Sequence, residues 1–185
     1  MMRKVFVLIT LLGITLVGCA NNEGKMQVKD HQESVSEAPV VETTENQTGA
    51  SGVEAPDFTL NDIHGKPLAL SSLRGKYVIL DFWGSWCSWC IKGIPEMKNY
   101  YNKYKEKFEI LGIDCNDTEQ KWKDAVKKYE LPWLHVYNPR DSKVLETYNI
   151  EGFPTKIIID PDGKIVKTII GEDPEFYTLL DQLFQ

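Results

Sequence analysis

The chain has 185 residues, which is room for one domain of ordinary size with extensions. Apolar residues make up 42% and charged residues 26% of the sequence, as in soluble globular proteins, which excludes a fibrous or wholly disordered chain. The net charge of −6 argues against a nucleic-acid partner, because such partners need a basic face.

Residues 1–18 predict an export signal. The basic pair Arg3-Lys4 precedes an apolar run over residues 5–17, which is shorter than the roughly 20 residues of a permanent membrane helix. The sequence Leu-Val-Gly that precedes Cys19 closely resembles the lipobox of bacterial lipoproteins. This resemblance implies cleavage before Cys19 and a lipid on its sulfur, which would attach the protein to a lipid membrane. An ordinary secretory signal that is cleaved elsewhere is the alternative.

Residues 19–52 predict a disordered tether that carries the lipid anchor at Cys19. The segment is rich in Asn, Glu, Ser, Thr and Gln, and it has neither a period nor an aromatic residue. Such a composition cannot bury enough apolar surface to offset the entropy of the chain. We therefore expect the folded domain to occupy residues 53–185 and to stand off the membrane on this tether.

Strands and helices are expected to alternate along residues 53–185. The apolar patterns predict strands over 55–60, 67–70, 77–83, 109–114, 134–137, 155–160 and 165–170, and helices over 91–108, 117–129, 141–148 and 174–184. Turn residues at 61–66 and at 161–164 indicate two hairpins. This order predicts an α/β fold with a central mixed sheet, flanking helices and an N-terminal β-hairpin extension.

The strongest functional signal is Cys87-Ser88-Trp89-Cys90, which follows the apolar strand 77–83 and opens a helix. The unpaired amides and the dipole of a helix start stabilise a thiolate at Cys87. We expect Cys87 to attack a substrate disulfide as the nucleophile, and the more deeply buried Cys90 to resolve the mixed disulfide. No other cofactor is needed for this exchange.

Two other interpretations of the cysteine pair are open. The pair could form a purely structural disulfide, although a loop this small constrains the unfolded chain little. It could also be half of a zinc site, but zinc needs two further ligands, and the three histidines are far apart in the sequence. We therefore predict no metal site.

Residues 81–90 closely resemble the active-site segment of thioredoxin-like proteins. The motifs at 55–58, 73–76 and 152–155 extend the resemblance over residues 53–185, to the membrane-anchored thiol–disulfide reductases of the ResA and TlpA type. The resemblance implies a thioredoxin-like fold and a cell-envelope enzyme, on the periplasmic side, that reduces protein disulfides. It also implies an upstream thiol electron donor at the membrane.

The same resemblance implies roles for three further residues. Pro154 would be the family's cis-proline facing the disulfide, and the Phe153 backbone would pair with an extended substrate segment. Asp81 would be a buried carboxylate that accepts the Cys90 proton. The alternatives are a proline that merely starts an edge strand and an aspartate satisfied by nearby amides. Trp86, beside Cys87, is interpreted as a wall of the substrate groove, with core packing as the alternative.

The sequence departs from the family at Gly93, where many relatives of the ResA type carry a glutamate. The acid–base role then rests on Asp81 alone or is weaker. Cys115 follows the strand 109–114, and it is either a small buried hydrophobe or an additional thiol near the site.

Two other functions compete with disulfide reduction. The opening at 55–58 also resembles that of peroxiredoxin-like thiol peroxidases, but the proline and threonine that those proteins place before their nucleophile are missing here. A thioredoxin-like copper-delivery module would use Cys87 and Cys90 as ligands, although such modules generally have a longer cysteine spacing.

Overall fold

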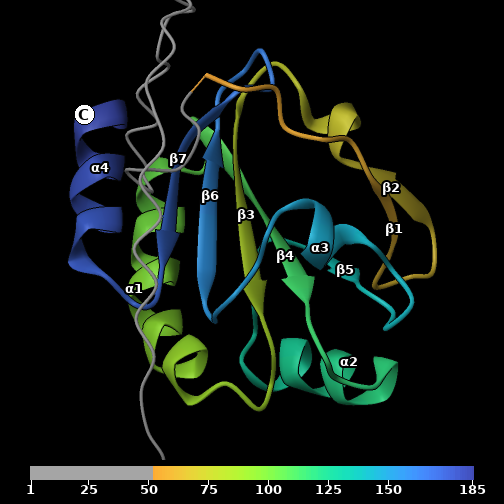
Figure 1. Ribbon diagram of the computed structural model, residues 1–185. Coiled ribbons are helices and arrows are strands. Elements are labelled where there is room, and N and C mark those ends of the chain that lie inside the picture. Colours follow the sequence, from red (N-terminus) through yellow and green to blue (C-terminus); the bar gives the residue numbers. More distant parts are fainter. Residues whose placement is uncertain (1–51) are drawn as a thin grey trace, which may run out of the picture. The chain divides into compact units, whose positions relative to one another are not determined.

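The computed structural model describes residues 52–185. The predicted signal segment 1–18, nearly all of the predicted tether and Cys19 lie outside the described residues. Seven strands form one mixed sheet in the order β2-β1-β5-β4-β3-β6-β7 (Figure 1). The strands are β1 (Thr59–Asp62), β2 (Pro67–Ala69), β3 (Tyr77–Trp83), β4 (Phe108–Asp114), β5 (Leu134–Tyr137), β6 (Thr155–Ile159) and β7 (Ile165–Ile170). The helices are α1 (Ser88–Tyr104), α2 (Glu119–Lys128), α3 (Val144–Thr147), α4 (Pro174–Phe184) and the short 3-10 helix η1 (Leu70–Leu73).

Strand β3 occupies the centre of the sheet and determines where the functional loops lie. It pairs in parallel with β4, so that Trp83 lies opposite Asp114, and antiparallel with β6, so that Phe82 lies opposite Thr155. The end of β3, the end of β4 and the start of β6 therefore meet at one edge of the sheet.

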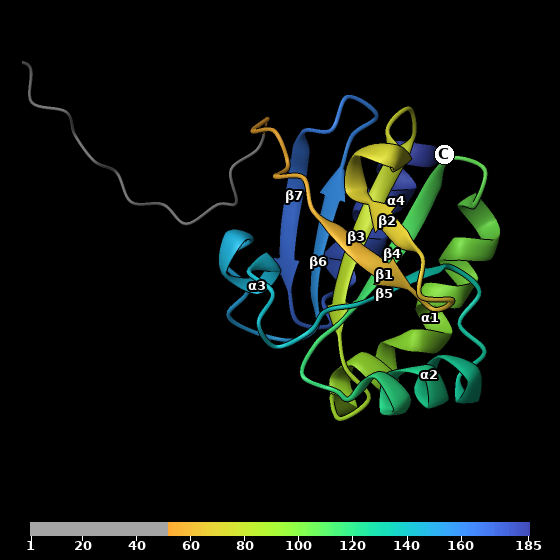
Figure 2. The same cartoon turned by 90° about the vertical axis from the view of Figure 1, so that its right-hand side faces the viewer.

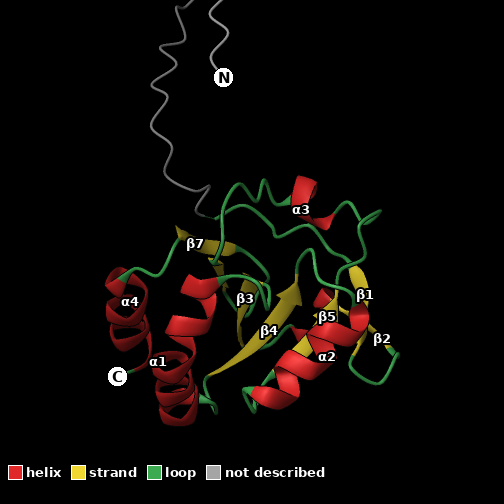
Figure 3. Cartoon of the chain, turned by 90° about the horizontal axis from the view of Figure 1, so that it is seen from below, coloured by secondary structure: helices red, strands yellow, loops and turns green. Residues whose placement is uncertain are grey.

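Both faces of the sheet are covered, which explains why β3 is apolar except for Asp81. Alternate β3 residues such as Ile79 and Trp83 pack with α1, α2 and α4. The residues between them, such as Leu80 and Phe82, pack with residues of α3, η1 and the N-terminal segment. Figure 3 shows α1, α2 and α4 on one side of the sheet and α3 on the other. No helix within residues 52–185 has the length and apolar character of a membrane span.

Helices α1 and α4 lie side by side, and one carboxylate joins them (Figure 1). Asp181 of α4 accepts hydrogen bonds from the hydroxyls of Tyr100 and Tyr104 and from the Lys103 ammonium, at 2.6 to 2.9 Å. These three donors hold the pKa of Asp181 well below its usual range, chiefly through the bond from Lys103. The seam between α1 and α4 therefore has a fixed geometry at its far end from the cysteines.

The predicted fold class, the mixed sheet and both hairpins are confirmed, with shifts at some element ends. The N-terminal hairpin pairs with β5 through β1 (Figure 2). Strand β1 starts at Thr59, not at residue 55, because Pro56 has no amide hydrogen to donate to a ladder. Helix α1 starts at Ser88 and ends at Tyr104, four residues before the predicted end. Phe108 instead begins β4 and is fully buried in the core.

Phe176 is the α4 side chain whose removal measures how much the packing of α4 on the core contributes to stability. Its ring is 1% exposed and packs against the sheet from α4. We expect Phe176→Ala to lower the free energy of unfolding by about 3–5 kcal/mol, because the smaller side chain leaves a cavity. Guanidinium unfolding should give a lower midpoint with an unchanged slope. The exposed Gln182→Ala on the same helix is the control and should change the stability by less than about 0.5 kcal/mol. Equal midpoints for the two variants would contradict this assignment of the core.

Candidate active site

Cys87 and Cys90 form a disulfide at the N-terminus of α1. Cys87 is the N-cap residue, and its sulfur accepts a hydrogen bond from the Cys90 amide at 3.1 Å. The sequence predicts that Cys90 is the more buried of the two, which the oxidised structure does not bear out. Their exposed fractions are 5% for Cys87 and 7% for Cys90, so burial in this oxidised state does not distinguish them. The helix geometry does, because only the Cys87 sulfur occupies the capping position next to the unpaired amides.

The loop that carries Cys87 is fixed by the neighbouring loop after β4. Asp117 accepts hydrogen bonds from the amide and the hydroxyl of Ser85, at 2.6 and 2.8 Å. The Trp86 indole donates to the Cys115 carbonyl at 2.8 Å. A side chain at Gly84 would collide with that indole, so glycine is required for the close approach of the two loops. The cysteine loop is therefore attached to the sheet independently of the disulfide.

The aromatic residues beside the disulfide form an exposed rim. Trp86 is 52% exposed, and its ring packs edge-on against Phe153, with ring centroids 5.3 Å apart. The bond between Phe153 and Pro154 is cis, as the resemblance implied, and Pro154 is buried with Cys90 along one hollow. Trp89, between the cysteines, is 58% exposed. Trp86, Phe153 and Pro154 thus lie together at the disulfide, and Trp86 is not packed in the core.

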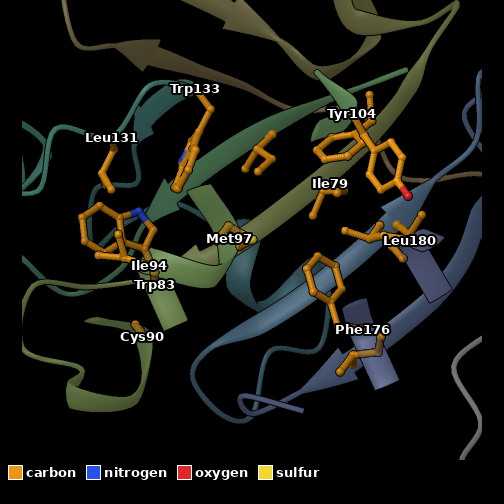
Figure 4. Close-up of a cluster of buried hydrophobic side chains, with 14 of the residues drawn as sticks. Ile79, Trp83, Cys90, Ile94, Met97, Tyr104, Leu131, Trp133, Phe176 and Leu180 are labelled. Carbon is orange, nitrogen blue, oxygen red and sulfur yellow. The ribbon is translucent and has the colours of Figure 1, made fainter. Parts of the chain in front are cut away.

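A narrow hollow of about 10 Å³ lies beneath the disulfide, and we call it the buried hollow. Its apolar wall belongs to the core cluster of Figure 4, in which Cys90 lies at the edge near Ile94 and Trp83. Its polar lining consists of three charged residues from different elements: Asp81, Lys156 and Glu172. The predicted proton acceptor Asp81 therefore borders the same space as Cys90.

Lys156 lies directly opposite Asp81 in the pairing of β3 with β6, so both side chains point to the α1 side of the sheet. The Lys156 ammonium nevertheless binds Glu172, at 2.9 Å, with exposed side-chain fractions of 3% and 16%. Among the described residues, Asp81 takes part in no ion pair. Burial is the main cause that raises its pKa to about 6; Lys156 opposes this shift and Glu172 adds to it. Asp81 can therefore exchange a proton close to neutral pH.

Asp81 is predicted from the sequence, whereas Lys156 and Glu172 are not. A signal existed for Lys156, since a lysine inside the apolar run 155–159, two residues after Pro154, is unusual for a strand that is buried. Nothing near Glu172 in the sequence marks it, because its importance depends on a contact with a strand 16 residues earlier. The departure at Gly93 was noted, and this glycine also borders the buried hollow.

Cys115 lies on the other face of the sheet from the disulfide. It is fully buried, and its thiol donates to the Ile113 carbonyl at 3.3 Å. Burial raises the pKa of this thiol strongly, which favours the inert thiol form. Within residues 52–185, no three His, Cys, Asp or Glu side chains are grouped so that they could hold a metal ion.

A disulfide on the first turn of a helix, next to a cis-proline and above a buried acid, defines a thioredoxin-like site for thiol–disulfide exchange. Comparison with known proteins agrees with this class. Residues 51–168 match the AhpC/TSA family. The thioredoxin domain of a thiol-disulfide oxidoreductase from Bacteroides vulgatus superposes with a TM-score of 0.68 and 37% identity, over 74% of this chain and 99% of that one. A putative thiol:disulfide interchange protein DsbE from Chlorobium tepidum superposes with a TM-score of 0.66 and 28% identity, over 72% of this chain and 94% of that one.

Curated relatives narrow the class further. The thiol-disulfide oxidoreductase ResA of Bacillus cereus (strain ZK / E33L) is 45% identical over 122 residues, which are 65% of this chain and 70% of the relative. ResA of Bacillus subtilis (strain 168) is 36% identical over 123 residues, 66% of this chain and 68% of that one. The chain belongs to the AhpC/TSA family and, within it, to the thiol–disulfide oxidoreductases of the ResA type.

The raised pKa of Asp81 predicts a dependence of stability on pH. The pKa in the folded protein lies above the ordinary value of 3.8, so the folded state binds this proton more tightly than the unfolded state. Asp81 therefore costs stability as the pH rises from about 4 to about 6, and the cost persists above that window. We expect oxidised Asp81→Asn to be more stable than the parent at pH 8, by up to about 3 kcal/mol, and equally stable near pH 4.

Guanidinium unfolding at pH 4, 6 and 8 measures this difference. The exposed Asp124→Asn is the control and should follow the parent within about 0.5 kcal/mol at each pH. The other buried acid, Asp114, whose pKa burial raises to about 8, contributes equally to all three proteins and cancels in the comparison. A constant difference between Asp81→Asn and the parent across this range would contradict the assignment.

Proposed function

We propose that this protein is a membrane-anchored protein disulfide reductase that works outside the cytoplasm. The observation that carries the proposal is the position of the Cys87–Cys90 disulfide, on the first turn of α1 and along the same hollow as Pro154 and Asp81. In this proposal Cys87 is the nucleophile, Cys90 is the resolving cysteine and Asp81 is the proton acceptor.

The cycle starts from the reduced pair. The Cys87 thiolate, stabilised by the start of α1, attacks a substrate disulfide, and the first substrate sulfur leaves and takes up a proton. The Cys90 thiol then gives its proton to Asp81 and attacks the Cys87 sulfur. The second substrate sulfur leaves and is protonated in turn, so two electrons and two protons pass to the substrate. The enzyme ends with the Cys87–Cys90 disulfide, and the two electrons come from its own cysteines.

The rim beside the disulfide suits a protein substrate. Trp86 offers an exposed aromatic wall, and the Phe153 backbone is positioned before the cis-proline to pair with an extended segment. Because half of the Trp86 surface is already in contact with solvent, binding would bury apolar area without rearranging the core. An upstream thiol donor at the membrane would then reduce the disulfide for the next cycle.

The location follows from the N-terminal sequence. A basic and apolar start followed by a lipobox-like segment favours export and lipid attachment at Cys19. Each buried methylene of a lipid chain contributes about 0.8 kcal/mol to membrane binding, so more than one chain is needed for a stable anchor. We propose that residues 19–52 carry the domain away from the membrane, on the periplasmic side of the cell envelope.

The roles of the two cysteines predict a trapping experiment. In Cys90→Ala the second step is blocked, so substrates should remain bound to Cys87 as mixed disulfides that mass spectrometry can identify. Cys87→Ala should lose disulfide reductase activity with a thiol donor and trap nothing. Cys115→Ala is the control and should retain activity, since that thiol is buried on the other face of the sheet. Full activity of Cys87→Ala would sink the proposed function.

The anchor predicts a change of location. Cys19→Ala should move the full-length protein from the membrane fraction to the soluble envelope fraction and abolish incorporation of labelled palmitate. Conversion of the neighbouring Ala20 to Ser is the matched control and should leave both properties unchanged. Palmitate labelling of Cys19→Ala at the level of the parent would refute lipid attachment at this residue.

A further inference from the structure

Gly93 faces a carboxylate from another part of the chain. It is buried one turn after Cys90 in α1, and a methyl group added to it would collide with the carboxylate of Glu172. Glu172 belongs to the connection between β7 and α4, 79 positions later in the sequence. The space that a side chain at position 93 would take is therefore filled by an acid from a different element.

Glu172 is held in this place by two hydrogen bonds. One oxygen accepts from the Lys156 ammonium at 2.9 Å and the other from the Tyr177 hydroxyl at 2.7 Å. Its side chain is only 16% exposed. The contacts fix both oxygens, so the position of the carboxylate is a built feature of the fold and not the result of a free surface rotamer.

The same carboxylate borders two spaces. On one side it lines the buried hollow with Asp81 and Cys90. On the other side it lines an open groove of about 490 Å³ between α1 and α4, which also includes Glu96 and Tyr177. Gly93 borders both spaces as well, because it has no side chain of its own to separate them. Glu172 thus stands between the inner acid and solvent.

We propose that Glu172 is a positioning residue for the thiol chemistry. From the β7–α4 connection it binds Lys156, and it acts on Cys90 through Lys156 and Asp81. This inference rests on the proposed function, in which Asp81 accepts the Cys90 proton.

The physical reason is that Asp81 and Glu172 could each bind the Lys156 ammonium. Asp81 and Lys156 are cross-strand neighbours and would pair if nothing else bound the ammonium. Such a pair would stabilise the Asp81 carboxylate and make it a poor base. By binding Lys156, Glu172 leaves Asp81 without a neutralising partner, and its own negative charge adds to the rise of the Asp81 pKa.

The group that titrates is Asp81, and the ionisable groups on each element packed around it influence its pKa. The ionisable groups around the two acids are Cys90, Lys92 and Glu96 of α1, Lys156 of β6, Asp173 before α4, and Tyr177 of α4 with Tyr100 of α1. Of the charged ones, only Lys156 bonds to Glu172. Removal of the Glu172 charge should therefore lower the pKa of Asp81, because repulsion disappears and Lys156 becomes available.

The test is Glu172→Gln, which keeps the shape and removes the charge. A carbon-13 NMR titration of the Asp81 carboxyl, assigned with Asp81→Asn, should show its pKa about one unit lower in the variant. Stopped-flow reaction of the reduced protein with dithiobis-nitrobenzoate releases one chromophore on Cys87 attack and a second on Cys90 attack. The second phase should slow roughly threefold to tenfold at pH 7, while the first phase stays within about twofold.

A positional exchange provides a rescue. Gly93→Glu alone should destabilise the protein, because two carboxylates would compete for one space. Gly93→Glu combined with Glu172→Ala should restore the parent pKa of Asp81 and the rate of the second phase, since the acid then reaches Lys156 from α1. This double variant also keeps the proposal testable if Glu172→Gln does not fold.

Glu175→Gln is the matched control, because Glu175 lies three residues after Glu172, at the start of α4, and forms an exposed ion pair with Lys167. It should leave the Asp81 pKa and both phases unchanged. An Asp81 pKa that does not move in Glu172→Gln, or a double variant that is folded but not rescued, would overturn the proposal. Neither outcome would be confused with failure of the proposed function, because that failure would appear as reductase activity in Cys87→Ala.

Discussion

The arrangement of this site depends on the two different partners of β3. Its parallel pairing with β4 and its antiparallel pairing with β6 bring two strand ends and one strand start to the same edge of the sheet. The cysteine loop, the loop of Asp117 and the loop of Pro154 must therefore meet there. Both faces of β3 are buried and Asp81 is its one charged residue, so a slip of one residue would turn Asp81 away from Lys156 and into the opposite apolar core.

That register also determines the electrostatics under the disulfide. Since Asp81 lies opposite Lys156, the sheet places an acid and a base side by side in a region that excludes water. A buried ion pair of this kind is seldom a source of net stability, because desolvation of both charges offsets their attraction. The ion pair here joins Lys156 to Glu172, and its effect on Asp81 explains it better. It leaves Asp81 without a neutralising partner, so that Asp81 can exchange a proton.

Residues that act within one short motif could be predicted from the sequence, and residues that act across elements could not. The strand before Cys87 and the helix after Cys90 are local patterns, the cis-proline at 154 is implied by the family resemblance, and the structure contains each of them. The end of α1 was misplaced because Phe108 fits the helical period equally well, and only its pairing opposite Tyr77 assigns it to β4. Gly93 was recognised as a departure, but its cause is a carboxylate 79 positions away, which no spacing rule connects to it.

The cysteine pair and the buried acids are coupled by charge. In the disulfide state neither cysteine carries a charge, and the hollow holds one ion pair and Asp81. In the reduced state a thiolate at Cys90 and a carboxylate at Asp81 would repel each other across the same small space, and the proposed proton transfer between them avoids two adjacent negative charges. The proposed proton transfer therefore requires a second acid that binds Lys156, since a lysine free to move to Asp81 would stabilise the Asp81 carboxylate and weaken it as a base. Glu172 meets that requirement from outside the cysteine helix, which is why the helix itself can carry a glycine at position 93.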